Sequence, residues 1–412
     1  MNEKTSIIAP KLDFNTPALR RYRKLRAMKD RLTTMFVGIG GMSVIVAILL
    51  IFVYLTYEVV PLFKGASISP WNEQYSTYSV GPSLPSLHLG VEEQNEVGFK
   101  LSSDAGVYFF ATEDGRIKAT DKLAFSEPGT ISAFALNSNV SRLFVVASKQ
   151  GEILVAKPDY DITYPNDERL ITPSLLYPYG KKAIDLPAGF GEPMVLAIRD
   201  AEEALIIVAA NANRQLSLIK LSKEQNFITE ILELSEEVYE LPALSSMPFK
   251  LLLSPDQRWL MAIDQDANLT ILDLRNLEKP RLHAVHKLSN YALSDAQLLL
   301  GGSTLTVADV SGAISQWFMV RDEENQWTLR HIRDFAQQQG AQILAMEHRR
   351  RSFTSADING NVALFSASAG VQVHREKLTQ EPIHFMAMSP RANAMLVEND
   401  SGQLSFWKVE NK

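Results

Sequence analysis

A short hairpin pattern recurs along most of this chain, and it constrains the fold more than any other feature of the sequence. A turn residue is followed two and five positions later by apolar residues, as in Ala267, Leu269 and Leu272, although the last position weakens to Thr120 and Ala156 in the first two copies. The apolar runs beside these turns, such as LFVVAS and ALIIVAA, are short and rich in β-branched residues, which predicts strands. The turn residues of the seven copies are Gly115, Gly151, Arg214, Ala267, Gly312, Gly360 and Gly402.

The residues that precede each turn repeat as well. Ser254 stands 13 residues before Ala267, and the segments SPDQRWL and SPRANAM align without a gap. In this register Asp256, Asp264 and Asp266 fall at or beside turns, so we interpret them as turn residues and not as metal ligands. The same 13-residue spacing separates Ser102, Ser138, Ser389 and Glu347 from their own turn residues. Rigid units joined by connections of variable length are typical of structural repeats.

Four-stranded antiparallel units that recur every 40–50 residues or so predict a β-propeller. We therefore expect an all-β domain of seven blades, of the WD40-like or YVTN-like kind, with six or eight blades as alternatives because the spacing from Gly151 to Arg214 is wide. The last copy is followed by too few residues to complete a four-stranded blade. We expect the segment 78–89, YSVGPSLPSLHL, to supply the missing strand and close the ring, which removes free sheet edges.

A long uncharged segment precedes the repeats. Residues 32–57, LTTMFVGIGGMSVIVAILLIFVYLTY, carry no formal charge and lie between Arg31 and Glu58. At about 1.5 Å per residue, a helix of this length exceeds the hydrocarbon core of a bilayer, which is about 30 Å thick. The alternative is a cleaved signal peptide, whose apolar region is usually only about 7–15 residues and ends at a small-residue cleavage site. The segment therefore predicts one transmembrane helix.

The distribution of charge predicts the orientation of this helix. Residues 1–31 contain nine Lys or Arg and three acidic residues, whereas the remainder has 32 basic and 44 acidic residues, a net charge of −12. The positive-inside rule places the N-terminus in the cytoplasm and the remainder in the periplasm of a bacterium, anchored by a single pass in the inner membrane. We expect a basic cytoplasmic segment at 1–31, the helix at 32–57, a linker at 58–74 and the propeller at 75–412. An acidic body argues against nucleic-acid binding.

Two further patterns lie in this N-terminal third. Apolar residues recur every three or four positions from Leu19 to Leu32 among basic ones, which predicts either a short amphipathic helix on anionic lipid or a solvated basic flank. Within the apolar segment, Gly40, Ser43 and Ala47 share one helix face. Small residues spaced in this way let a second helix approach closely, so we expect a helix-packing site there or else an ordinary apolar span.

Residues suited to catalysis or metal binding are sparse. The chain contains no cysteine, which excludes disulfides, thiolate metal sites and cysteine nucleophiles. His283 and His286 form an H-x-x-H pair without a third ligand nearby in the sequence. No glycine-rich phosphate loop, nucleophile elbow or zinc signature occurs, so we expect no enzymatic activity, no cofactor and no bound metal. The turn EHRRR places Arg349, Arg350 and Arg351 together, either as a contact for an anion or a partner or as a solvated turn.

Three segments near the N-terminus carry a family resemblance. FNTPALRRYRKLR (14–26), KDRL (29–32) and YLTYEVVPLFKGA (54–66) resemble the long form of the proteobacterial phosphate ABC-transporter permease PstC. The resemblance implies a first transmembrane helix followed by a large periplasmic propeller-like insertion, with the permease core after it. Residues 58–412 contain no second apolar segment of that kind and no cytoplasmic coupling loop. We therefore expect the permease core to lie outside this sequence, and no substrate-path residue carries over.

The anchor, the propeller and the resemblance together favour one function. We expect a non-catalytic periplasmic propeller of a phosphate ABC import system, whose helix contacts the permease subunit or permease half and whose propeller contacts the periplasmic phosphate-binding protein. The alternative is a free-standing scaffold or sensor, anchored in the inner membrane, that binds other envelope proteins. An enzymatic propeller, such as a quinone-dependent dehydrogenase, requires clustered acidic metal ligands and a cofactor pocket, and the sequence contains neither signal.

Overall fold

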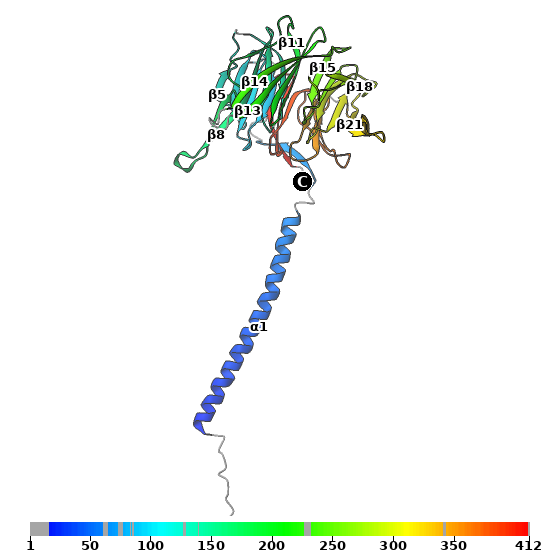
Figure 1. The fold of residues 1–412 in the computed structure, drawn as a ribbon. Coiled ribbons are helices and arrows are strands. Elements are labelled where there is room, and N and C mark those ends of the chain that lie inside the picture. The colour runs from blue at the N-terminus through cyan, green and yellow to red at the C-terminus, as the bar shows by residue number, and fades with distance from the viewer. Residues whose placement is uncertain are drawn as a thin grey trace, which may run out of the picture. The chain divides into compact units, whose positions relative to one another are not determined.

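The computed structural model of this protein describes residues 16–60, 65–72, 77–82, 84, 86–126, 129–138, 140–225, 232–340 and 343–410. The chain forms two separate units, the first ending at Gly65 and the second spanning Ala66–Asn411. The first unit contains a helix, and the second is built from strands (Figure 1).

The first unit is dominated by one uninterrupted helix, α1 (Pro17–Val59), which is 43 residues long. Proline suits the first turn of a helix because its missing N–H would have no partner there. At 1.5 Å per residue the helix is about 65 Å long, roughly twice the thickness of a bilayer core. The segment 19–32 is therefore helical, as one of the two alternatives expected, and is continuous with the apolar segment 32–57, whereas its contact with lipid stays a prediction. All residues of α1 are solvent-exposed within the chain.

The second unit is a seven-bladed β-propeller of antiparallel sheets. Blades are numbered here in chain order, and strands within a blade run from first to fourth outward from the ring centre. Blade one has β2 (Ser86–Val91), β3 (Val97–Ser102), β4 (Gly106–Ala111) and β5 (Ile117–Lys122). Blade two has β6 (Ile131–Leu136), β7 (Phe144–Ser148), β8 (Glu152–Thr163), β9 (Leu170–Leu176) and β10 (Ile184–Asp185), with β9 and β10 both paired to the long β8.

The next three blades have four strands each. Blade three has β11 (Pro193–Asp200), β12 (Ala204–Asn211), β13 (Leu216–Gln225) and β14 (Leu232–Leu241). Blade four has β15 (Pro248–Leu253), β16 (Trp259–Asp264), β17 (Asn268–Asp273) and β18 (Arg281–Lys287). Blade five has β19 (Leu293–Leu298), β20 (Thr304–Asp309), β21 (Ile314–Arg321) and β22 (Trp327–Asp334).

The last two blades differ in how they are assembled. Blade six has β23 (Ile343–Met346), β24 (Ser352–Ala356), β25 (Asn361–Ser366) and β26 (Val371–Lys377). Blade seven has β27 (Ile383–Met388), β28 (Ala394–Asn399) and β29 (Leu404–Glu410), and its fourth strand is β1 (Ser67–Pro70) from the other end of the domain. Residues more than 300 positions apart in the sequence therefore share one sheet.

The strand that completes blade seven is not the one expected from the sequence. β1 pairs with β29 from Ser67 opposite Glu410 to Pro70 opposite Trp407, within the 58–74 stretch expected to be a linker. The segment 78–89 contributes only an isolated bridge from Tyr78 to Leu404 and the start of β2. The prediction for 78–89 is therefore wrong. Burial of Ile68, which is 5% exposed, stabilises β1 at this position. Pro70 is tolerated because β1 is an edge strand.

The register of the first repeat also differs from the prediction. Gly115 lies between the third and fourth strands of blade one, whereas the other six turn residues lie between second and third strands. The equivalent residue in blade one is Ala105, which has a φ of 66°. Ser102 accordingly matches Asp264 in blade four and not Ser254. The first copy was misplaced by one strand because Gly115 carries a stronger turn signal than Ala105.

Apolar cores lie between neighbouring blades and not within one central cluster. Seven such clusters occur among the described residues, one for each junction of the ring. The cluster between blades seven and one contains Leu89 and Phe110 from blade one and Leu396 and Phe406 from blade seven. Since the closing junction is packed like the other six, the ring is closed.

Candidate functional site

The two ends of the propeller carry different turns. Because neighbouring strands are antiparallel, the turns after the first and third strands of every blade lie on one face, and the turns after the second strands lie on the other. We call these the first-turn face and the second-turn face. The arginines of the EHRRR turn lie on the first-turn face, between β23 and β24. The repeated turn residues, from Ala105 to Gly402, lie on the second-turn face.

A ring of buried polar residues supports the second-turn face. Each residue stands three positions before the turn residue of its blade, and each is less than 9% exposed. In blade five, Oδ1 of Asp309 accepts hydrogen bonds from the backbone N–H groups of Ser311 at 2.9 Å and Ala313 at 3.1 Å. These side chains therefore hold the turns, as Asx-type caps do. The ring consists of Ser102, Ser148, Asn211, Asp264, Asp309, Asp357 and Asn399.

The surroundings of Asp264 show how hydrogen bonds within this ring affect the pKa of a buried carboxylate. Burial raises the pKa of Asp264, hydrogen bonds from Ser246 and Asn268 lower it, and the net pKa lies below its usual value. Ser246 donates to Oδ2 at 2.5 Å and the backbone N–H of Asn268 donates to Oδ1 at 2.8 Å. The carboxylate is thus engaged in the turn. The ring as a set went unrecognised in the sequence, although a Ser, Asn or Asp three residues before each turn residue would have revealed it.

The three arginines of blade six differ in their contacts. Arg350 donates from Nε to Oε1 of the fully buried Glu347 at 2.5 Å, so its charge is neutralised. Arg349 donates from Nε to the carbonyl oxygen of Pro390 in the first turn of blade seven, at 3.3 Å. The guanidinium of Arg351 is exposed and makes no ion pair with any described residue. The turn predicted as a contact for an anion or a partner therefore presents two arginines that no carboxylate neutralises.

His348, in the same turn, adds no charge to this group. Burial lowers the pKa of His348 to about 4, an effect that the nearby carboxylate of Glu347 opposes only in part. The imidazole is therefore neutral near pH 7. The positive charge of the turn comes from its arginines alone.

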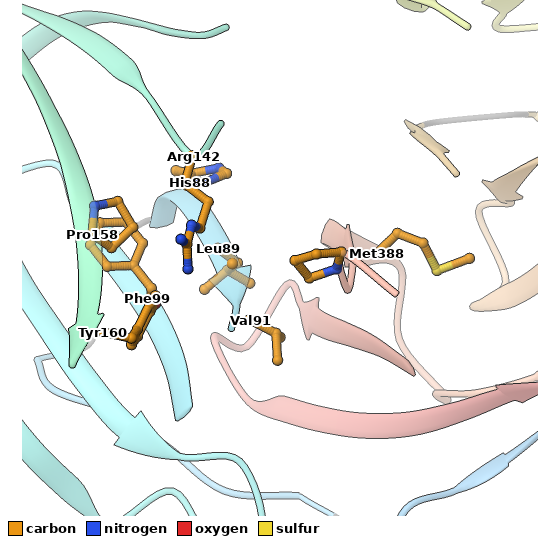
Figure 2. Close-up of a pocket in the computed structure, with 10 residues that line it drawn as sticks. His88, Leu89, Val91, Phe99, Arg142, Pro158, Tyr160 and Met388 are labelled. Carbon is orange, nitrogen blue, oxygen red and sulfur yellow. The ribbon is translucent and has the colours of Figure 1, made fainter. Parts of the chain in front are cut away.

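A small pocket opens on the first-turn face between blades one, two and seven. Figure 2 shows Pro158 and Tyr160 of β8 on one wall and Met388 on the other. His88 is 7% exposed and stacks on Phe134, with ring centroids 5.1 Å apart. Burial lowers the pKa of His88 to about 3, so the ring is neutral at ordinary pH.

The polar groups of this pocket do not form a catalytic pair. Arg142 lies over the ring of Tyr160, with its guanidinium carbon 5.0 Å from the ring centroid. Burial raises the pKa of Tyr160 well above its usual value, so the phenol stays protonated. No carboxylate lines the pocket among the described residues. A neutral imidazole and a neutral phenol beside one arginine offer no strong base at neutral pH.

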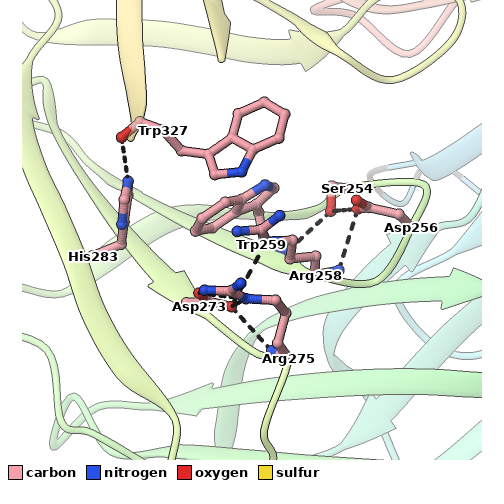
Figure 3. A network of polar contacts seen from close by, with 8 residues as sticks. All are labelled: Ser254, Asp256, Arg258, Trp259, Asp273, Arg275, His283 and Trp327. Carbon is pink, nitrogen blue, oxygen red and sulfur yellow. Dashed lines mark hydrogen bonds and ion pairs between the residues drawn. The ribbon is translucent and has the colours of Figure 1, made fainter. Parts of the chain in front are cut away.

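A cation–π network joins blades four and five on the same face (Figure 3). The guanidinium carbon of Arg258 lies 4.3 Å from the ring centroid of Trp259 and 5.1 Å from that of Trp327. Asp273 accepts from Arg275 at 2.6 Å and lies 3.9 Å from Arg258. Because each of these charges is paired or stacked within the protein, the network stabilises the junction between the blades.

The H-x-x-H pair lies on β18 beside this network. Nε2 of His283 is 2.8 Å from the carbonyl oxygen of Trp327, so one of its two nitrogens is already engaged. Burial, reinforced by the nearby His283, lowers the pKa of His286. Within the part of the chain that the structure describes, no three His, Asp or Glu side chains come together in a way that could hold a metal ion.

The small-residue stripe of α1 is open on the outside of the helix. A Cβ at Gly40 would meet no atom within 4 Å, and the hydroxyl of Ser43 donates to the carbonyl oxygen of Gly40 at 2.8 Å. The face formed by Gly40, Ser43 and Ala47 is exposed and geometrically free for another helix. Helix packing on this stripe stays a prediction.

Comparison with known proteins identifies the fold of the chain but does not assign the chain to a family. No protein-family model matches the sequence, and no curated protein matches it. The β-propeller domain of Cps50 (Swd1) from Myceliophteria thermophila, a crystal structure, is similar with a TM-score of 0.57 and 14% sequence identity, covering 84% of this chain and 100% of that domain. A similarity at this identity defines the class of fold, a seven-bladed β-propeller behind a long apolar helix. The resemblance to the phosphate permease gains no support from these comparisons.

Proposed function

We propose that this protein is a membrane-anchored, non-catalytic β-propeller that serves as an interaction scaffold. The observation that carries the proposal is α1, the one helix among the described residues that is long and apolar enough to cross a membrane. The apolar segment of this helix, residues 32–57, is exposed on all sides and contacts no other part of the described chain closely enough to be buried. Apolar surface of that extent requires cover by lipid or by other apolar helices.

Three hydroxyl groups of the apolar segment support lipid as the main cover. Thr34 donates its hydroxyl to the carbonyl oxygen of Asp30, Ser43 to that of Gly40 and Thr56 to that of Phe52, each at 2.8 Å. These hydroxyls are satisfied by the helix itself and need no water. A helix that satisfies its own polar groups is suited to a hydrocarbon environment.

The absence of a catalytic role rests on how the reactive side chains are used. The buried aspartates of the second-turn face are engaged in turns, and His88 and His348 are neutral near pH 7. Propellers present broad turn faces on a rigid ring, which suits the recognition of other proteins. We infer a binding function for the propeller on these grounds.

Labelling of single cysteines tests the anchor and its orientation. The chain contains no cysteine, so Ser401→Cys on the second-turn face and Lys24→Cys near the start of α1 each create a unique thiol. A membrane-impermeant maleimide should label Ser401→Cys in intact spheroplasts and Lys24→Cys only after permeabilisation. Release of the propeller from the membrane with α1 removed would show a signal peptide and contradict the anchor.

For the partner, we propose the permease of a phosphate ABC importer, on the strength of the N-terminal resemblance at 14–26, 29–32 and 54–66. The helix would pack on the permease through Gly40, Ser43 and Ala47, which would place the propeller where the periplasmic phosphate-binding protein delivers its cargo. The alternative, a free-standing scaffold or sensor of the envelope, is favoured by the lack of any family match. The reading frame downstream of the gene would distinguish these, because a permease needs about six further apolar spans.

Purification of the tagged protein from phosphate-starved cells tests the partner directly. Importer subunits should co-purify with the natural chain, and a Gly40→Leu/Ala47→Leu variant should lose them because leucine blocks close helix approach. Ile45→Leu, on the opposite side of α1, is the matched control and should retain them. Recovery of no importer subunit with the natural chain would contradict this partner and leave the envelope scaffold as the better explanation.

A further inference from the structure

Four exposed arginines form one group on the first-turn face, here called the arginine patch: Arg349, Arg350, Arg351 and Arg391. The first three belong to the first turn of blade six, and Arg391 belongs to the first turn of blade seven. The hydrogen bond from Nε of Arg349 to the carbonyl oxygen of Pro390 joins the two turns side by side. The four guanidinium groups therefore act on the same area of surface.

The patch keeps a net positive charge of about +3. Glu347 is the one acidic residue in these two turns, and it is fully buried against Arg350 and Ser352. No described carboxylate forms an ion pair with Arg349, Arg351 or Arg391. The first turn of neighbouring blade one is acidic, with Glu92, Glu93 and Glu96. The net positive charge of these two turns therefore stands beside an acidic turn of the neighbouring blade.

The chain comes into the propeller at this same face and in one of the same blades. Ser67, the first residue of β1, pairs with Glu410, the last residue of β29, and both lie at the first-turn end of blade seven. Residues 60–66 alone separate α1 from β1. An extended chain covers at most about 3.6 Å per residue, so this connection spans no more than about 25 Å. This covalent connection limits the distance between the C-terminal end of α1 and Ser67, the first residue of β1 in blade seven.

We propose that the arginine patch binds the headgroups of anionic phospholipids on the outer surface of the membrane that α1 spans. The proposal rests on the anchoring function proposed above. Arginine forms bidentate hydrogen bonds with phosphate oxygens, and a tethered basic surface meets lipid at high local concentration. The attraction of basic residues to anionic lipid falls off within a Debye length and weakens with salt. Lipid is favoured over a soluble partner because the chain that continues from α1 joins blade seven on the same propeller face as the patch.

Site-directed spin labelling of the full chain in lipid nanodiscs tests this proposal. Ala369→Cys lies in the exposed turn after the third strand of blade six, beside the patch, and Ser401→Cys lies on the opposite face. In discs containing phosphatidylglycerol, the label at 369 should become several-fold less accessible to a water-soluble nickel relaxant than in discs of phosphatidylcholine alone. High salt should abolish the difference. The label at 401 should report the same accessibility in both lipids.

Substitutions in the patch distinguish lipid binding by these particular arginines from a general effect of positive charge on the first-turn face. Arg349→Ser/Arg351→Ser/Arg391→Ser removes the three arginines that no carboxylate neutralises and leaves Arg350 to satisfy the buried Glu347. This variant should lose the protection of the label at 369. Arg116→Ser, which removes an exposed arginine from the same face in blade one, is the matched control and should keep it. Unchanged melting of both variants would exclude an effect through misfolding.

Several outcomes overturn the proposal. Equal accessibility at 369 in neutral and anionic discs, or protection that survives the triple substitution, would show that the patch does not bind lipid. Loss of protection on addition of inorganic phosphate at constant ionic strength would assign the patch to free phosphate. Protection that appears only when an envelope protein is added would assign it to a protein partner. Stable retention of the chain in both kinds of disc tests the anchor separately, and a chain that leaves the discs contradicts the anchor and the patch together.

Discussion

Three of the seven second turns place a residue other than glycine in the left-handed region of backbone conformation. Ala105, Arg214 and Ala267 have φ values of 66°, 65° and 62°. Each donates its N–H to the carbonyl oxygen of the polar residue three positions earlier, at 2.9–3.1 Å. The turn is therefore imposed by its hydrogen bonds and its buried polar residue, and glycine is favoured there without being required. For this reason glycines alone were an incomplete guide to the repeat, and Ala105 was overlooked.

Two glycines of these turns differ in the space around them. Gly312 and Gly402 have φ values of 92° and 75°, but a Cβ at Gly312 would lie 1.9 Å from the carbonyl oxygen of Gln338, whereas one at Gly402 would meet nothing within 4 Å. We expect Gly402→Ala to lower the free energy of unfolding by about 1–2 kcal/mol, the cost of the left-handed conformation. Gly312→Ala should cost clearly more, because backbone must move. Urea denaturation measures both, and equal losses would contradict the steric explanation.

The buried histidine of blade one predicts a pH dependence. The pKa of His88 is about 3 in the folded protein because of burial, against about 6.5 when the chain is unfolded. The unfolded state therefore binds a proton between these values, and stability present above pH 6.5 is lost as the pH falls towards 3. From pH 7 to pH 5 this single group should remove about 2 kcal/mol of the free energy of unfolding.

Replacement of His88 by phenylalanine checks this assignment. His88→Phe should reduce the loss of stability between pH 7 and pH 5 by about 2 kcal/mol, whatever its effect at pH 7. His384→Gln, at an exposed position, is the control for the loss of a histidine. An identical pH profile for His88→Phe and the natural protein, measured by chemical denaturation, would show that His88 is not protected from protonation.

At the scale of elements, the sequence predicted hairpins well and the two ends of the propeller poorly. Strands such as β16 and β17 have apolar, β-branched sequences between clear turns, so pattern and structure agree. β1 has four residues, SISP, and its position depends on pairing with β29, which lies more than 300 residues away. No local pattern encodes such a partner. The basic start of α1 was ambiguous for a related reason, since charge on a helix and charge on a solvated flank look alike in sequence.

The fourth strand of blade seven should matter for stability through one side chain. Ile68 is 5% exposed and packs in the cluster between blades six and seven. Ile68→Ala should lower the free energy of unfolding by about 2–4 kcal/mol, since it leaves a cavity. Ile117→Ala on β5, where the side chain is 42% exposed, should cost less than about 1 kcal/mol. Thermal unfolding of the two variants ranks them, and a reversed order would contradict the role of β1 in closure.

At the scale of the whole molecule, the candidate sites were harder to predict than the ring. The arginine turn was visible in sequence, but its link to blade seven through Pro390 was not, because it depends on how the blades meet. The pocket around His88 combines residues from three blades and had no sequence signal. Hairpin spacing is local information, whereas a site shared between blades arises only when the ring closes.

A buried ion pair spans the junction where the ring closes. Nζ of Lys100 in blade one lies 3.4 Å from Oε1 of Glu398 in blade seven, and both residues are 1% exposed. Ser86 also donates its hydroxyl to Oε1 of Glu398 at 2.7 Å. Lys100→Met alone should lower the free energy of unfolding by about 3–5 kcal/mol, because it leaves a buried carboxylate without its counter-charge.

A double-mutant cycle measures the interaction free energy between Lys100 and Glu398. Lys100→Met/Glu398→Leu should recover most of the stability lost in Lys100→Met, since an apolar pair needs no counter-charge. Lys220→Met, which breaks the exposed pair with Glu237, should have little effect. Denaturation of the four proteins of the cycle measures the coupling, and additive losses would indicate that the two charges do not depend on each other.

The pairing of β1 with β29 has a consequence for how this domain can be combined with others. Ser67 and Glu410 are partners across two neighbouring strands, and such strands lie about 5 Å apart. The backbone therefore leaves the ring almost where it came in. A module of this kind can be spliced between two consecutive helices of a host protein without forcing them apart, and it can equally be circularly permuted by joining 410 to 67 with a short loop.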